Sequence, residues 1–198
     1  MSINYVHKYF PFISKEKRDN LKIDPIGLYS ISTPKNAEII TGYIKKYYKN
    51  SNVVVTDAMA GVGGNTLSFA SALYHVNAIE LDESRSFFLI SNLSLYKQNN
   101  VLCINADYFT IMHRLKQDII FLDPPWGGKS YKDSESMTIQ IGERTLESIC
   151  DEIYENKLCS MLLLKLPLNY DIDTFSIPMK QIMIVERLQK ILIIIVLC

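Results

Sequence analysis

The 198-residue chain lacks several features that would assign it to a class of protein at once. Its 21 basic and 21 acidic residues cancel, so no overall charge marks it as a binder of nucleic acids or membrane surfaces. It shows no apolar N-terminal stretch typical of a secretory signal, and the apolar run ILIIIVLC is too short to span a bilayer. We therefore expect an intracellular protein of the nucleus or cytoplasm, a viral protein acting in a host cell included, without membrane contact.

Cysteine and histidine are also scarce. The four cysteines show no C-x-x-C spacing and the three histidines no ligand spacing, so we expect reduced thiols and no metal site. The chain has no internal repeat and no low-complexity linker. An apolar share of 48% and a charged share of 21% are typical of one globular domain with a sizeable core, and we expect a monomer.

The charges that are present are unevenly distributed. Residues 1–50 hold nine Lys or Arg and four Asp or Glu (9 − 4 = +5), so the remainder carries −5. A basic segment beside an acidic body fits a polyanion contact at one end of the chain. A solvated, mildly basic helix explains the same charges.

Apolar runs alternate with helical patterns along most of the chain. Strands are expected to end at Asp57 and to cover 76–82, 101–107, 118–125, 159–167, 181–189 and 190–198. Helices are expected from Pro34, after an N-cap at Thr33, to about Tyr47, then over NTLSFASAL, up to about Tyr96, and over 142–156, with short helices around Pro11 and an extended or turning segment at 23–33. This order predicts an α/β, Rossmann-like fold: a mostly parallel seven-stranded sheet with a C-terminal antiparallel hairpin and helices on both faces.

Glycines cluster between the first expected strand and its helix, in VVVTDAMAGVGGNT. Glycine permits positive φ angles and close approach of a ligand, and a helix N-terminus presents unpaired N–H groups. The pattern is not the G-x-G-x-x-G of dinucleotide-binding folds, and Asp57 stands four residues before Gly61. An acid there disfavours a pyrophosphate and suits a cationic group, such as the amino-acid end of S-adenosylmethionine (SAM).

Two further acids end the next two expected strands. Glu80 is placed to accept both ribose hydroxyls of a nucleoside, and Asp107 to accept from an adenine amino group. The carboxyl ends of parallel strands form the ligand-binding edge of an open α/β sheet. A strand-end cap or a solvated loop explains each acid by itself, but the three acids and the glycine turn together indicate a SAM site.

The segment FLDPPWGG (121–128) ends the fourth expected strand in a stiff corner. Its two prolines fix φ and lack N–H groups, which leaves the carbonyls of Asp123 and Pro124 to accept from an amino group. Trp126, the chain's one tryptophan, offers a flat face for a base, with cation–π attraction if the base is charged. A rigid turn with a core tryptophan is the alternative. The strand-end position favours a methyltransferase that aims an exocyclic base nitrogen at a methyl donor.

At these residues the chain resembles a known family. The matching segments are DAMAGVGGNT (57–66), AIELD (78–82), NADYF (105–109) and FLDPPWGGKSY (121–131), with further similarity over 8–34 and 166–172. Together they resemble trimethylguanosine synthase, the cap guanine-N2 methyltransferase. The resemblance implies methyl transfer from SAM to N2 of the 7-methylguanosine cap of RNA, which gives the dimethyl and then the trimethyl cap.

The resemblance also implies roles for individual residues. Trp126 would stack on the 7-methylguanine, Tyr131 would contact the cap phosphates, and an N-terminal arm (1–34) would complete the cap pocket of the methyltransferase domain (35–198). SAM would be held by Asp57, Ala58, Gly61, Gly63, Gly64, Asn65, Thr66, Glu80, Asp107 and Tyr108. Catalysis would fall to Asp123, Pro124, Pro125 and Trp126. Asn169, after the fifth strand, either lines the cap pocket or forms a turn.

Two residues depart from the family pattern. Asp123 stands where the family has serine, and an acid there is typical of adenine-N6 and other guanine-N2 methyltransferases. Leu168 replaces an arginine expected to bind cap phosphate. Two alternatives therefore stay open: adenine-N6 or guanine-N2 methylation of DNA, tRNA or rRNA, and a SAM-fold protein that recognises caps without catalysis.

Overall fold

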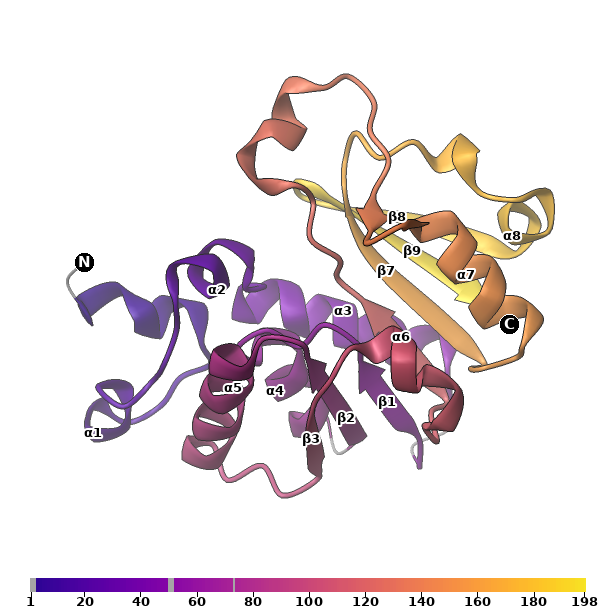
Figure 1. Ribbon diagram of the computed structural model, residues 1–198. Coiled ribbons are helices and arrows are strands. Elements are labelled where there is room, and N and C mark those ends of the chain that lie inside the picture. Colours follow the sequence, from indigo (N-terminus) through magenta and orange to yellow (C-terminus); the bar gives the residue numbers. More distant parts are fainter. Residues whose placement is uncertain (1–2, 50–51, 73) are drawn as a thin grey trace. The chain divides into compact units, whose positions relative to one another are not determined.

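The computed structural model describes residues 3–49, 52–72 and 74–198, which form two compact units, Met1–Lys116 (unit 1) and Gln117–Cys198 (unit 2) (Figure 1). Unit 1 contains η1 (Ile3–Tyr9), α1 (Lys15–Arg18), α2 (Pro25–Ser30), α3 (Pro34–Tyr47), β1 (Val54–Asp57), α4 (Gly64–Ser71), β2 (His75–Glu80), α5 (Glu83–Leu95), β3 (Val101–Asn105), α6 (Tyr108–Ile111) and η2 (Met112–Arg114). Unit 2 contains β4 (Ile119–Leu122), η3 (Gly128–Asp133), β5 (Gln140–Ile141), β6 (Arg144–Thr145), α7 (Leu146–Glu155), β7 (Met161–Pro167), η4 (Ile172–Thr174), α8 (Ile177–Ile182), β8 (Met183–Leu188) and β9 (Ile191–Leu197).

The main sheet has seven strands in the order β3-β2-β1-β4-β7-β9-β8. In unit 1, β2 pairs in parallel with both β1 and β3. In unit 2, β4 and β7 are parallel, whereas β9 is antiparallel to both β7 and β8. The predicted α/β, Rossmann-like fold with its mostly parallel sheet and C-terminal hairpin is therefore confirmed.

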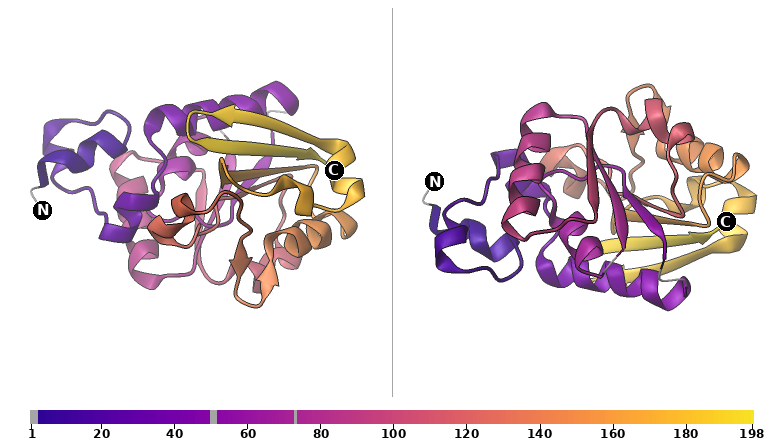
Figure 2. Two further views of the ribbon diagram at one scale, coloured as in Figure 1. Left: turned by 90° about the horizontal axis from the view of Figure 1, so that it is seen from above. Right: turned by 90° about the horizontal axis from the view of Figure 1, so that it is seen from below.

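The N-terminal segment packs into the core of unit 1. Phe10 is buried in one cluster with residues of the glycine turn and of α5, among them Val62 and Leu89. Farther along, the Asn92 side-chain amide donates to the carbonyls of Lys22 and Val62, at 2.9 and 3.0 Å. These contacts join residues 10–22 to the turn that follows β1, and both ribbon views in Figure 2 show the N-terminal helices beside α5.

Unit 2 is built around two deeply buried strands. Every residue of β7 is buried, as are the first six residues of β9, and Figure 2 shows β8 and β9 as one long hairpin. Continuous burial is typical of a strand covered on both faces. Lys165 is the one charged residue of β7, and its side chain lies within this otherwise apolar strand.

Two local predictions were wrong. The segment 23–33 was expected to be extended or turning, but it contains the helix α2. The Asp24 side chain caps this helix by accepting from the Gly27 N–H at 2.9 Å, and Pro25 occupies the first helical position. The helix expected over 142–156 begins only at Leu146. Before it, Gly142 turns the chain with φ +63° into the short β5–β6 hairpin.

The predicted helix from Pro34 to Tyr47 is confirmed by α3, with Thr33 as its N-cap. All four cysteines are free thiols. Among the described residues, no helix is long and apolar enough to cross a membrane.

Candidate active site

The first strand of unit 1 ends in a buried acid that the next helix holds in place. Asp57 is 1% exposed, and its Oδ2 accepts from the Thr66 hydroxyl at 2.6 Å. Thr66 lies in the first turn of α4, and Ala58, next to Asp57, is buried as well. Two residues predicted to bind the cofactor therefore contact each other directly, which fixes the orientation of the carboxylate at the carboxyl end of β1.

The glycines of the turn serve two different purposes. Gly61 and Gly63 have positive φ angles of +55° and +102°, which side chains strain to adopt, and a Cβ on Gly61 would have nothing within 4 Å. A Cβ on Gly64, by contrast, would lie 2.7 Å from Ile31 Cγ1 and 3.1 Å from the Ser32 carbonyl oxygen. Gly61 thus leaves space in which a ligand can approach the backbone, whereas Gly64 makes room for the chain just before α3.

Asn65 is a buried polar residue in the first turn of α4. Its side-chain amide nitrogen donates to the Ser32 hydroxyl at 3.1 Å. Its Oδ1 is buried and, among the residues that the structure describes, meets no hydrogen-bond donor. A buried acceptor without a partner costs about 1–3 kcal/mol, so a ligand N–H at this atom would bind favourably.

Glu80 at the end of β2 is already held by protein donors. Its Oε2 accepts from the Gly61 N–H at 2.8 Å, and its Oε1 accepts from the Asp82 N–H at 2.8 Å and from Arg85 Nε at 3.4 Å. A carboxylate has about four acceptor positions. Glu80 keeps one of them on Oε2, so it has room for one ribose hydroxyl rather than the predicted two while Arg85 stays in place.

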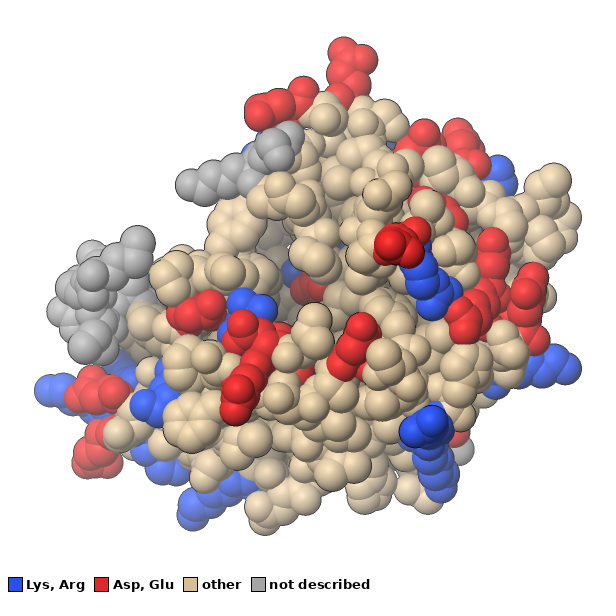
Figure 3. Space-filling view, in the orientation of Figure 1, with Lys and Arg blue, Asp and Glu red and all other residues tan. Residues whose placement is uncertain are grey.

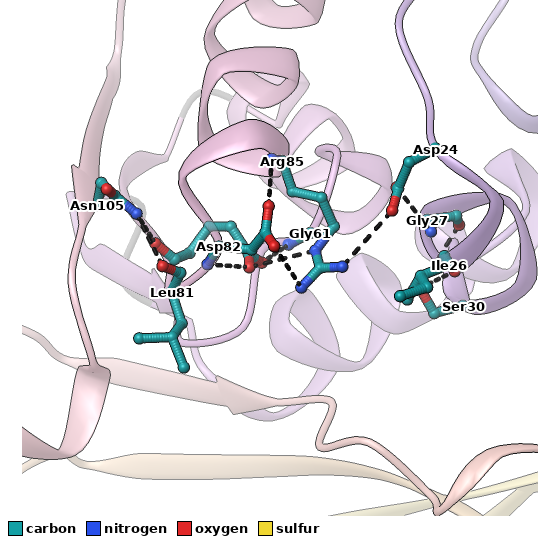
Figure 4. Close-up of polar contacts among 10 residues, drawn as sticks. Asp24, Ile26, Gly27, Ser30, Gly61, Leu81, Asp82, Arg85 and Asn105 are labelled. Atoms are coloured by element: carbon teal, nitrogen blue, oxygen red, sulfur yellow. Dashed lines mark hydrogen bonds and ion pairs between the residues drawn. The ribbon is translucent and has the colours of Figure 1, made fainter.

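Arg85 was missed by the sequence analysis. Its guanidinium lies 3.6 Å from Asp82 Oδ2 and 3.6 Å from Asp24 Oδ2 (Figure 4). It also contacts Glu80. The signal was available locally, since Arg85 follows Asp82 by three residues at the start of a helix. The contact with Asp24 was not available, because Asp24 is distant in sequence.

The third acid follows β3 and caps a helix. Asp107 is the N-cap of α6 and accepts from the Phe109 N–H at 2.9 Å. Tyr108 is buried, with its ring edge-on to that of Phe109. Just before them, the Asn105 amide donates to the Glu80 carbonyl at 2.7 Å, which ties the ends of β2 and β3 together. In unit 1 the structure thus gathers the ends of three neighbouring strands, each with its acid, as the sequence predicted.

In unit 2, β4 leads into a corner made of Asp123, Pro124, Pro125, Trp126, Gly127 and Gly128. Pro124 is buried and Pro125 is exposed. Both glycines have φ +80°, a conformation that side chains rarely adopt, with open space at the Cβ position. The indole is only partly buried, and its Nε1–H donates to the Lys165 carbonyl at 3.3 Å. Trp126 is therefore an ordered ring with some accessible surface.

Lys165 is the second residue of the site that the sequence patterns did not predict. Its side chain is 8% exposed, its Nζ donates to Asp123 Oδ2 at 2.6 Å, and the same Nζ lies 5.3 Å from the centroid of the Trp126 ring. Burial raises the pKa of the Asp123 carboxyl above its usual value, and the Lys165 ammonium opposes this through its charge and its hydrogen bond. The departure at position 123 thus comes with a buried counter-charge.

The loop after the corner is held against Trp126 by an aromatic ring. Tyr131 meets the indole edge-on, with centroids 5.2 Å apart and an interplanar angle of 85°. The Asn169 amide donates to the carbonyls of Tyr131 and Ser134, both at 2.7 Å. Asn169 therefore positions the loop that carries Tyr131. Its neighbour Leu168 is 43% exposed.

Some basic side chains of the N-terminal segment bond to other parts of the protein. Figure 3 shows Lys and Arg gathered where α1 lies in Figure 1. Lys17 Nζ donates to the Leu95 carbonyl at 2.8 Å, and Arg18 donates to the Ile13 carbonyl at 3.1 Å while its guanidinium lies 5.6 Å from the ring centroid of the exposed Phe12. Part of this charge therefore fastens the segment itself. Within the described part of the chain, no cluster of His, Cys, Asp and Glu could hold a metal ion.

Residues 52–196 match the model of the family described as RNA cap guanine-N2 methyltransferase. The chain belongs to this family. An uncharacterized protein of Acanthamoeba polyphaga mimivirus is 33% identical over 190 residues, which cover 84% of this chain and 74% of that protein. The trimethylguanosine synthase of Schizosaccharomyces pombe is 28% identical over 57% of this chain, and the match spans only 49% of the yeast enzyme.

Solved structures of methyltransferases share the fold of this chain. A putative methyltransferase from Porphyromonas gingivalis superposes with a TM-score of 0.64 over 99% of this chain and 54% of its own, at 15% identity. An RNA methyltransferase from Salinibacter ruber, in complex with S-adenosyl-L-homocysteine, has a TM-score of 0.53 over 80% of this chain and 89% of its own, at 11% identity. At such identities the likeness is one of fold.

Proposed function

We propose that this methyltransferase transfers a methyl group from SAM to the exocyclic N2 of the 7-methylguanosine cap of RNA. The family match and the relation to trimethylguanosine synthases support this activity. The observation that carries the proposal is Trp126, a partly exposed indole fixed by its own N–H and by Tyr131, inside a segment that resembles the family.

The residues of unit 1 that are predicted to bind the methyl donor have the chemistry that SAM requires. The buried Asn65 Oδ1 and the Asp57 carboxylate are acceptors suited to an ammonium group, and Gly61 leaves space beside the backbone. Glu80 would accept one ribose hydroxyl through Oε2, and Asp107 would accept from the adenine amino group. When bound, SAM supplies a methyl group attached to a positively charged sulfur. After transfer of the methyl group, the rest of the molecule leaves as a neutral thioether.

The corner in unit 2 provides what an amino nucleophile needs. The lone pair of a guanine N2 is delocalised into the ring, so most of the catalytic help comes from orientation. Trp126 would hold the base flat by stacking, worth about 1–3 kcal/mol. The Asp123 carboxylate is an acceptor for the N–H that points toward it. The nitrogen loses one proton when it gains a methyl group, and that proton would pass to Asp123 or to water.

A direct assay tests the activity. The protein is incubated with SAM and the dinucleotide cap analogue m7GpppG, and mass spectrometry counts the methyl groups added. The matched substrate is unmethylated GpppG, which has the same phosphates and the same purine but no positive charge. We expect one or two added methyls on m7GpppG and little on GpppG. Binding of m7GpppG without transfer would instead identify a protein that recognises caps without catalysis.

A second candidate is methylation of adenine N6 or guanine N2 in DNA, tRNA or rRNA. Asp123 favours it, because an acid at the start of this corner is typical of such enzymes and the acid is paired with Lys165 at 2.6 Å. Competition separates the two candidates. Free 7-methylguanosine triphosphate inhibits methyl transfer in the first case and leaves transfer to bulk RNA or DNA unchanged in the second.

A further inference from the structure

Lys165 occupies a position that disfavours a charge. It lies in the fully buried strand β7, between Leu164 and Leu166, and only 6% of the residue is exposed. Removing an ammonium group from water costs several kcal/mol unless an opposite charge and good hydrogen bonds compensate. The compensation comes from Asp123, whose Oδ2 is 2.6 Å from Nζ. The parallel register of β4 and β7 explains this contact, because Leu122 pairs with Leu164 and the next residues along are Asp123 and Lys165.

Lys165 also contacts Trp126 in two independent ways. Its backbone carbonyl accepts from the indole Nε1–H at 3.3 Å, which fixes the edge of the ring. Its Nζ lies 5.3 Å from the ring centroid, within the distance at which a cation is attracted to an aromatic face. One residue therefore constrains both the acid and the aromatic ring of the corner.

We propose that Lys165 is a positioning residue of the methyltransferase site: it holds the Asp123 carboxylate and the Trp126 indole in one arrangement and supplies the counter-charge that an acid at position 123 requires. The proposal rests on the proposed function in so far as the corner binds the base. It accounts for the departure from the family's serine, since a neutral hydroxyl needs no buried ammonium beside it.

The pair also sets the charge that a stacked base meets. Together, Lys165 and Asp123 carry no net charge, so a positively charged 7-methylguanine can stack on the indole without repulsion. Removal of the carboxylate alone leaves the Lys165 ammonium unpaired at 5.3 Å from the centroid of the ring on which the base would stack, and like charges in a buried site repel strongly. The Asp123→Ser variant should therefore lose more affinity for m7GpppG than for neutral GpppG.

The chain's one tryptophan allows a test that does not depend on enzymatic activity. Its fluorescence, followed from neutral to acidic pH, reports the protonation of the nearby Asp123. Burial raises the pKa of Asp123 and the Lys165 ammonium lowers it, so Lys165→Met should move the fluorescence transition to higher pH. Asp123→Asn should abolish the transition. If the pH midpoint of the fluorescence transition is the same in Lys165→Met as in the wild-type protein, the proposal is overturned.

Lys46→Met is the matched control. Lys46 is exposed, and its Nζ lies 4.6 Å from the ring centroid of Tyr47. The variant therefore also removes an ammonium group beside an aromatic ring, but at a position distant in sequence from the corner. It should leave the tryptophan titration and the methylation rate unchanged.

Activity measurements on a double variant complete the test. We expect Lys165→Met to lower the methylation rate by at least about tenfold, because misplacement of orienting groups is costly. The variant Asp123→Ser/Lys165→Met removes both charges and should be more active than Lys165→Met. If the rates of the two single variants multiply to give that of the double variant, Lys165 does not act through Asp123 and the proposal fails.

The outcomes separate this proposal from the proposed function. If the wild-type protein methylates no cap, the cap activity fails, while the fluorescence titration still decides whether Lys165 controls the corner. If Lys165→Met does not fold but the double variant does, the counter-charge role is supported. If neither folds, Lys165 is required for packing and the positioning role is overturned.

Discussion

The two units hold their acids in different ways. In unit 1, Glu80 accepts two backbone N–H groups and shares the partly exposed Arg85 with Asp82 and Asp24. In unit 2, Asp123 depends on one buried lysine. The first arrangement is redundant and its arginine is partly solvated, whereas the second, among the described residues, has a single ionic partner in an apolar strand.

The difference decides what a substitution costs. Exposed or shared ion pairs contribute about 0–1 kcal/mol each, because water screens them and other partners remain. Loss of one partner of a buried pair costs about 3–5 kcal/mol, because a charge stays in the interior without compensation. The ion pairs around Arg85 in unit 1 should therefore tolerate single substitutions better than the Asp123–Lys165 pair of unit 2.

The largest expected effect comes from Asp123→Leu. It leaves the Lys165 ammonium buried without its acid and should lower the free energy of unfolding by about 3–5 kcal/mol, as measured by urea denaturation. The variant Asp123→Leu/Lys165→Met, which replaces both charges by apolar groups of similar size, should recover most of this loss. A cost below about 1 kcal/mol for the single variant would show that the pair is screened like a surface pair.

Trp126→Ala should come next and should act on activity. Loss of the stacking surface is expected to lower the rate of cap methylation by about a hundredfold. Binding of SAM, measured by calorimetry, should persist, since the residues predicted to bind SAM lie in unit 1. Trp126→Phe keeps a ring without the N–H bond to Lys165 and should retain part of the activity. Methylation by the alanine variant at the wild-type rate would show that the base does not stack here.

Gly63→Ala tests the turn of unit 1. At φ +102°, and with Leu89 Cδ1 2.9 Å from the added Cβ, the variant should lose about 1–2 kcal/mol of stability and bind SAM more weakly. Gly42→Ala is its control, because Gly42 lies inside α3 with open space at the Cβ and alanine favours a helix by about 0.5–1 kcal/mol. Thermal unfolding of both variants should give shifts of opposite sign.

Arg85→Met should have the smallest effect. Glu80 keeps its two backbone donors, so we expect a loss below about 1 kcal/mol in urea denaturation. Affinity for SAM should not fall, because the second acceptor position on Oε1 becomes available to the ribose. A loss as large as that of Asp123→Leu would remove the contrast between the two units.

Local signals made much of the fold predictable. Thr33 before Pro34 predicted the start of α3, and the acids after three apolar runs predicted the polar ends of β1, β2 and β3. The helix α2 was missed although Asp24 and Pro25 are a cap and a first-turn proline, because the segment is short and lacks an apolar period. The β5–β6 hairpin was missed because its strands have only two residues each.

Sequence patterns also predicted that Trp126 follows a strand, but not what holds its ring in place. Nothing local distinguishes Lys165 in SMLLLKLP from a charge at the end of a strand, and nothing pairs it with Asp123. In the same way, the need for glycine at position 64 comes from Ile31 and Ser32, which the turn itself does not reveal.

By itself the sequence determined the order of the long strands and helices, the glycine turn, the acids at the strand ends and the proline–tryptophan corner, because period, caps and backbone restrictions act between near neighbours. Only the tertiary structure decided which of these groups have partners. Asp123 and Lys165 are 42 residues apart, and they meet because β4 and β7 pair in one register inside an apolar core, where a lone charge is too costly to remain.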